Sequence, residues 1–157
     1  MQIRFEPMDL VTATHLRNAG LDSNGNPPEQ QTSNGIGVPC RVCMKMVGKD
    51  EPFLVAGWRP FSATHAYAET GPVFLHAKEC TADPVPSGAL PEFLESPDYI
   101  LRGYDADERI VYGTGGVIKL EDMLARMEEL LSQPNIEAVH IRSSRNNCYH
   151  CKATKVG

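Results

Sequence analysis

Pro39-Cys40-Arg41-Val42-Cys43 and Cys148-Tyr149-His150-Cys151 carry the strongest structural signal in this sequence. Each stretch contains a C-x-x-C pair, and two intervening residues allow a tight turn to direct both sulfur atoms at one metal ion. Two such pairs supply the four ligands of a tetrahedral zinc site. The sequence therefore predicts a zinc site formed by Cys40, Cys43, Cys148 and Cys151.

The two pairs are far apart along the chain, because residues 44–147, 104 in all, separate them. Compact zinc modules place their pairs about 12–20 residues apart. The predicted site therefore requires the tertiary fold to bring the first long loop to a C-terminal knuckle. A metal that closes so long a loop removes conformational entropy from the unfolded chain, so we expect it to stabilise the fold.

His76 and Cys80 are further candidate ligands. Their spacing of four residues would place both side chains on one side of a helical turn. Six candidates then compete for four positions: one of these two replaces a member of the pairs, or Cys80 is a free thiol, or a second ion binds nearby. Four thiolates leave no open position for water, which favours a structural role for the zinc over a catalytic one.

Bulk properties restrict the class of protein. The chain has 157 residues, 41% of them hydrophobic and 22% charged, as expected of one globular domain spanning residues 1–157. The net charge of −5 argues against a nucleic-acid partner held by phosphate contacts. The sequence contains no apolar run of membrane-span length and no signal-peptide core. We therefore expect a cytoplasmic protein without a membrane partner, in which cysteines serve metal or redox chemistry before disulfides.

The apolar pattern predicts an α+β fold with a mainly antiparallel sheet and two principal helices. Residues 22–38 are polar, rich in Asn, Gly, Pro and Gln, and without periodicity, which predicts a long loop. The expected strands cover residues 2–6, 53–58, 73–75, 99–104, 109–112 and 138–142, and the expected helices run from Asp9 to about Gly20 and from Leu120 to Leu131.

A catalytic alternative uses the polar loop between the strands expected at 53–58 and 73–75. This loop contains Arg59, His65 and Glu69, and it leads into the strand that ends at His76. In this interpretation His76 and two or three cysteines hold zinc as a Lewis acid. Glu69 or His65 then serves as the base and Arg59 holds an anion. The alternative function is a zinc-dependent, hydrolase-like enzyme.

A third interpretation is a thiol redox protein with Cys40 and Cys43 as its dithiol. Arg41 between them favours a thiolate. The strand-then-helix context typical of a thioredoxin-like site is missing from the sequence, which makes this interpretation weaker.

Four stretches also carry a resemblance to a known family, and they span most of the chain: Gly37-Val38-Pro39-Cys40-Arg41, Tyr67-Ala68-Glu69-Thr70-Gly71-Pro72-Val73-Phe74-Leu75-His76-Ala77, Leu101-Arg102-Gly103-Tyr104-Asp105-Ala106 and Asn147-Cys148-Tyr149. With these motifs the chain resembles the family of small bacterial proteins catalogued as a domain of unknown function, number twelve hundred and three. The resemblance implies a single α+β domain, with Cys40, Arg41 and Cys148 at motif positions, in a cysteine-rich branch. It implies no established activity and no partner.

Overall fold

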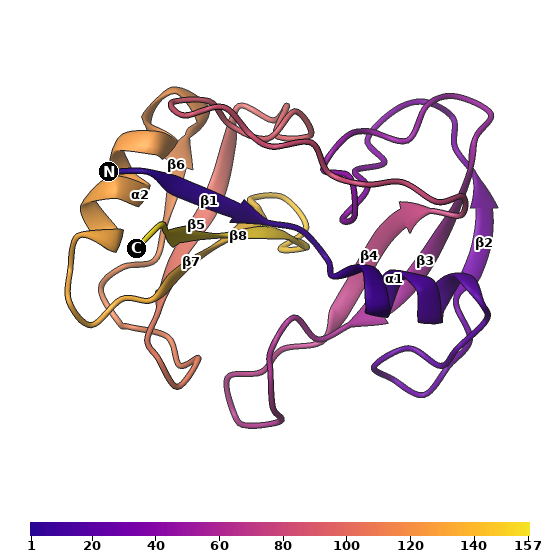
Figure 1. Cartoon of the computed structure of the whole chain (residues 1–157), viewed down its shortest axis with the longest axis horizontal. Helices are drawn as coiled ribbons and strands as arrows, with labels where there is room; N and C mark the ends of the chain where they lie inside the picture. The colour runs from indigo at the N-terminus through magenta and orange to yellow at the C-terminus, as the bar shows by residue number, and fades with distance from the viewer.

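Two antiparallel sheets form the framework of the protein (Figure 1). The computed structural model describes all 157 residues. The larger sheet has the order β1 (Ile3–Glu6), β8 (Tyr149–Lys155), β7 (Ala138–Ser143), β5 (Asp98–Tyr104) and β6 (Gly116–Lys119). The smaller has the order β2 (Glu29–Thr32), β3 (Pro52–Trp58) and β4 (Gly71–His76). With the helices α1 (Leu10–Arg17) and α2 (Met123–Leu131), this architecture confirms the predicted α+β class with mainly antiparallel sheet.

The five-stranded lobe consists of the larger sheet and α2, which follows the short 3-10 helix η1 (Leu120–Asp122). Apolar residues recur at helical spacing in α2, and Met123, Met127, Leu130 and Leu131 are buried. They pack in a core of 15 buried residues with side chains of β5, β7 and β8, including Leu101, Ile141 and Cys151. The amphipathic pattern that predicted this helix is therefore the pattern that attaches it to the sheet.

The three-stranded lobe consists of the smaller sheet, α1 and the turn that contains Cys40 and Cys43. The Asp9 carboxylate accepts a hydrogen bond from Thr12 N at 2.8 Å and caps α1, as the sequence suggested. A second core of 13 buried residues joins α1 to β3 and β4 and includes both cysteines. The helices of this protein lack the length and apolar character that a membrane span requires.

The chain passes twice between the lobes (Figure 1). It begins in the five-stranded lobe with β1, crosses to α1, and returns through the connection between β4 and β5. Because β1 pairs with β8, both chain termini lie in the five-stranded lobe. Within the three-stranded lobe, the turn at Cys40 lies beside the C-terminal part of β4, at Phe74 and His76.

Two predicted details of the strands are wrong. Residues 22–38 are not loop throughout, because β2 forms there and pairs with β3. All four of its residues are exposed, so it has no apolar alternation to reveal it. In the second case, the predicted strand at 109–112 makes only the bridge Tyr104↔Ile110, and β6 is the segment that pairs with β5.

Candidate metal centre

Cys40 and Cys43 lie on a tight turn that the backbone closes on itself. Cys40 N donates to Lys45 O at 2.9 Å, and Met44 N donates to Cys40 O at 3.0 Å. Met44 has a φ of +58°, the left-handed conformation that reverses the chain at this point. Both cysteines are buried. The C-x-x-C pair therefore has the turn geometry that its spacing predicted.

β4 brings His76 to this turn. Cys40 forms a parallel bridge with Phe74, and His76, the last residue of the strand, donates its backbone N–H to Cys40 Sγ at 3.3 Å. Cys80 follows in a bent segment and not in the helical turn predicted from its spacing, which is a correction. The bend nevertheless returns the Cys80 thiol to within 3.7 Å of Cys40 Sγ.

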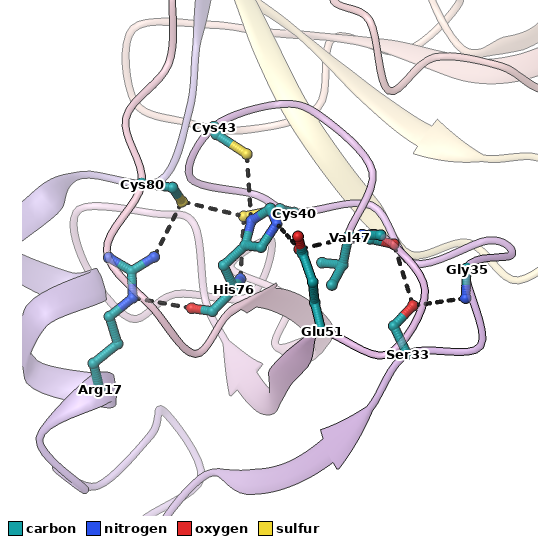
Figure 2. Close-up of polar contacts among 10 residues, drawn as sticks. Arg17, Ser33, Gly35, Cys40, Cys43, Val47, Glu51, His76 and Cys80 are labelled. Atoms are coloured by element: carbon teal, nitrogen blue, oxygen red, sulfur yellow. Dashed lines mark hydrogen bonds and ion pairs between the residues drawn. The ribbon is translucent and has the colours of Figure 1, made fainter.

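The four side chains Cys40, Cys43, His76 and Cys80 converge on one point (Figure 2). Their ligand atoms all lie within 4.8 Å of one another, close enough to hold a metal ion. Cys40 Sγ and Cys80 Sγ are 3.7 Å apart, and Cys43 Sγ and His76 Nδ1 are 3.5 Å apart. Zinc–sulfur bonds of about 2.3 Å and zinc–nitrogen bonds of about 2.0 Å in a tetrahedron give S···S and S···N separations of roughly 3.8 and 3.5 Å. The two separations in the structure, 3.7 and 3.5 Å, match these values.

Glu51 orients the imidazole of His76. His76 Nε2 lies 3.1 Å from Glu51 Oε2, while Nδ1 faces Cys43 (Figure 2). A metal-binding histidine commonly donates its remaining ring N–H to a carboxylate, which fixes the tautomer and makes the other nitrogen a better ligand. The geometry thus leaves Nδ1 as the ligand atom. The sequence gave no indication of Glu51, because it lies 25 residues from His76.

Arg17, in the last turn of α1, supplies a positive charge beside the thiols. Its Nη2 donates to Cys80 Sγ at 3.2 Å and its Nε donates to His76 O at 3.0 Å. Three thiolates and a divalent cation carry a net charge of −1, which the guanidinium offsets. Arg17 therefore both suits a metal-bound cluster and attaches α1 to it.

The three thiols of the cluster differ in pKa. Hydrogen bonds with Cys43 and Cys80 lower the pKa of Cys40, and the same interaction with Cys40 raises the pKa of Cys43 and of Cys80. The pKa of Cys40 is therefore the lowest of the three. A metal must displace the other thiol protons, so its binding releases protons and weakens as the pH falls.

Cys148 and Cys151 lie outside this group of four. Cys151 is on β8, opposite Ile141, and is buried in the core of the five-stranded lobe, which raises its pKa to about 12. Cys148 precedes β8, and its Sγ lies 3.7 Å from Asn146 O. The predicted C-terminal knuckle is wrong, because residues 149–155 form a strand between β1 and β7. An extended segment spreads its side chains to opposite faces and does not direct two sulfurs at one point.

The loop with Arg59, His65 and Glu69 lies at the opposite end of the β3–β4 hairpin from His76. The register pairs Trp58 with Gly71 at the loop end and Phe53 with His76 at the other. The Glu69 carboxylate forms ion pairs with Arg102, 2.8 Å from Nη1 to Oε1, and with Arg142, 3.5 Å from Nη1 to Oε2. The structure therefore does not bring these three candidates to the metal centre.

Residues 37–155 match a family model described as Protein of unknown function (DUF1203). The chain belongs to this family. The predicted resemblance is thereby confirmed, whereas no curated protein and no solved structure gives a significant match. In this DUF1203 protein all four converging side chains lie within the matched range, while α1 and its Arg17 precede it.

Proposed function

We propose that Cys40, Cys43, His76 and Cys80 bind one zinc ion, which stabilises the three-stranded lobe of this DUF1203 protein. The observation that carries this proposal is the pair of separations, 3.7 Å between two sulfurs and 3.5 Å between a sulfur and a nitrogen. A soft donor set of three thiolates and one imidazole in a tetrahedron is typical of zinc.

The role of the ion is structural. Four protein ligands fill a tetrahedral site and leave no position for a substrate or a water molecule. The ion closes the chain between Cys40 and Cys80, which restricts the unfolded state. It also joins the C-x-x-C turn to the end of β4, in a lobe whose sheet has only three strands. A small core with so few strands gains most from such a crosslink.

Neither catalytic alternative has comparable support. A hydrolase centre needs Glu69 or His65 beside the metal, but both belong to the loop at the far end of the hairpin. Glu69 is also held there by two arginines. A redox dithiol needs an accessible sulfur, and Cys40 is 0% exposed. The structural zinc site is therefore the function that this geometry supports best.

Differential alkylation with peptide mapping tests the ligand set. Native untagged protein is alkylated before and after treatment with a strong chelator. We expect Cys80, which is only partly buried, to resist alkylation until zinc is removed. The buried Cys40 and Cys43 should then also be labelled, because the lobe opens more readily once the ion no longer crosslinks it. Equal labelling of Cys80 in both samples would contradict the proposal. If Cys148 and Cys151 were the thiols that become alkylated only after chelation, the result would support the four-thiolate site predicted from the sequence.

Glu51→Ala is expected to weaken zinc binding by about 10–100-fold, because His76 loses the carboxylate that orients it. Glu51 is exposed, so the fold should change little. Competition with a chromogenic chelator measures the affinity. Glu29→Ala, on the exposed strand β2 of the same lobe, is the matched control. Identical affinities of the two variants would show that Glu51 does not act on the metal centre.

A further inference from the structure

A pocket lies at the loop end of the β3–β4 hairpin. Its volume is about 200 Å³, and it lies between the residues that open β4 and the segment that leads into β8. Figure 1 shows this segment, in yellow, facing the three-stranded lobe. Gly71, at the pocket, and His76 stand at opposite ends of β4, and five steps of about 3.3 Å along the strand separate them by roughly 16 Å. The lining includes Glu69, Thr70, Arg142, Asn147, Cys148 and Tyr149.

Arg142 is the unusual residue of this pocket. It is only 4% exposed, and its Nε and Nη2 are buried without a hydrogen-bond partner. Nη1 is the one side-chain nitrogen with polar partners, Asn147 O at 3.3 Å and Glu69 Oε2 at 3.5 Å. Native proteins rarely leave buried charged donors unpaired, because the lost hydration is costly. The unpaired atoms therefore indicate a group that is absent from the protein chain itself.

The unpaired atoms also indicate the shape of that group. Nε and Nη2 form one edge of the guanidinium, with two parallel N–H bonds. This edge matches two oxygen atoms of a carboxylate or a phosphate, and the paired hydrogen bonds are stronger than neutral ones.

The charge around the pocket favours an anion. Arg102 donates to Glu69 Oε1 at 2.8 Å and to Asn147 Oδ1 at 3.0 Å. Arg41, which is buried, donates to Tyr149 O at 2.7 Å. Two guanidinium groups, those of Arg102 and Arg142, therefore contact the Glu69 carboxylate, and a third, that of Arg41, binds the backbone of Tyr149. The formal excess of positive charge attracts small anions.

Cys148 supplies a free thiol in this setting. It lines the pocket, is partly buried, and makes only the weak contact with Asn146 O. Partly exposed thiols beside arginines are the ones that react. The pocket lining thus combines a buried guanidinium that has two unpaired donors with a partly exposed thiol.

We propose that the pocket of Arg142 and Cys148 binds a small oxyanion, a carboxylate or a phosphate, with two of its oxygens on the free edge of Arg142 and its body beside the Cys148 thiol. The site is separate from the metal centre and does not depend on the zinc assignment.

A pair of alkylating reagents tests this proposal on the full-length protein. Iodoacetate and iodoacetamide differ in charge but hardly in size. With either reagent the Cys148 thiolate attacks the CH2 carbon, an S–C bond forms, the C–I bond breaks and iodide leaves. Peptide mass spectrometry reports the rate at Cys148 separately from the other cysteines. We expect the iodoacetate-to-iodoacetamide rate ratio at Cys148 to exceed that of a free model thiol by about tenfold, the lower range for charge-lined clefts.

Competing anions and variants complete the test. Acetate and inorganic phosphate, added separately at constant ionic strength, should slow the reaction with iodoacetate, and the stronger competitor identifies the class of ligand. Arg142→Gln should return the rate ratio to that of the model thiol. Should that variant not fold, Glu69→Gln is expected to raise the ratio, because it removes the one negative charge beside Arg142. A wild-type ratio equal to that of the model thiol, without protection by either anion, would overturn the proposal.

Discussion

Replacing Cys40 by serine is expected to abolish zinc binding and to cause the largest loss of stability of any single cysteine change. Cys40 is fully buried, and its Sγ lies 3.7 Å from Cys80 Sγ. The same sulfur accepts a hydrogen bond from the backbone N–H of His76. A ligand present at 1,000 times its dissociation constant stabilises a protein by about 4 kcal/mol. For a chain of this length that loss corresponds to a fall in Tm of roughly 8–16 °C. Thermal unfolding with metal analysis of the same sample measures both effects.

The matched control for Cys40→Ser is Cys148→Ser, which changes a thiol outside the converging group. It should retain the zinc and the Tm of the unaltered protein. Chelation of the unaltered protein gives an independent measure, because it should lower the Tm as much as Cys40→Ser does. A chelated protein with an unchanged Tm would contradict a structural role for the ion, whether or not the serine variant folds.

Replacing Arg41 by alanine is expected to destabilise the protein by roughly 2–6 kcal/mol. Arg41 is 2% exposed, and it donates to Tyr149 O at 2.7 Å and to Pro39 O at 2.8 Å. Without it, two buried carbonyl groups lose their partner, at about 1–3 kcal/mol each. Because Tyr149 begins β8 and Pro39 precedes the C-x-x-C turn, the change weakens the contact between the two lobes. Chemical denaturation monitored by circular dichroism measures the free energy of unfolding.

Arg4→Ala is the control for this variant, since Arg4 is exposed on β1 and should have an effect within about 0.5 kcal/mol. Arg41→Ala should nevertheless keep its zinc, because Arg41 donates no hydrogen bond to the metal centre. An Arg41→Ala protein as stable as Arg4→Ala would show that the two buried carbonyls do not depend on the guanidinium.

Local sequence pattern alone could predict the elements that have regularly spaced apolar residues or a capping residue. The helical recurrence of Met123, Met127 and Leu130 predicted α2, and the Asp9 cap predicted the start of α1. β2 escaped prediction because all four of its residues face solvent and main-chain pairing alone holds it beside β3. An edge strand of this kind carries no signal in its side chains.

The candidate metal centre shows the same limit. The sequence identified Cys40, Cys43, His76 and Cys80 as candidates, but it favoured Cys148 and Cys151 over the last two. Identical C-x-x-C spacing occurs on a closed turn in one case and at the start of a strand in the other. Only the tertiary pairing of the turn with β4 separates the two. Glu51 and Arg17 gave no local signal, because each reaches the centre through the fold.

Zinc content per chain, by elemental analysis of protein purified without added metal and without a polyhistidine tag, tests the central claim most directly. The zinc content of two variants should be measured in the same way. His76→Ala changes a residue of the converging group, and Cys151→Ala changes a residue in the core of the other lobe. The account predicts about one zinc per chain in the unaltered protein and in Cys151→Ala, and none in His76→Ala. Metal-free unaltered protein, or zinc that is lost with Cys151 and kept without His76, would contradict it.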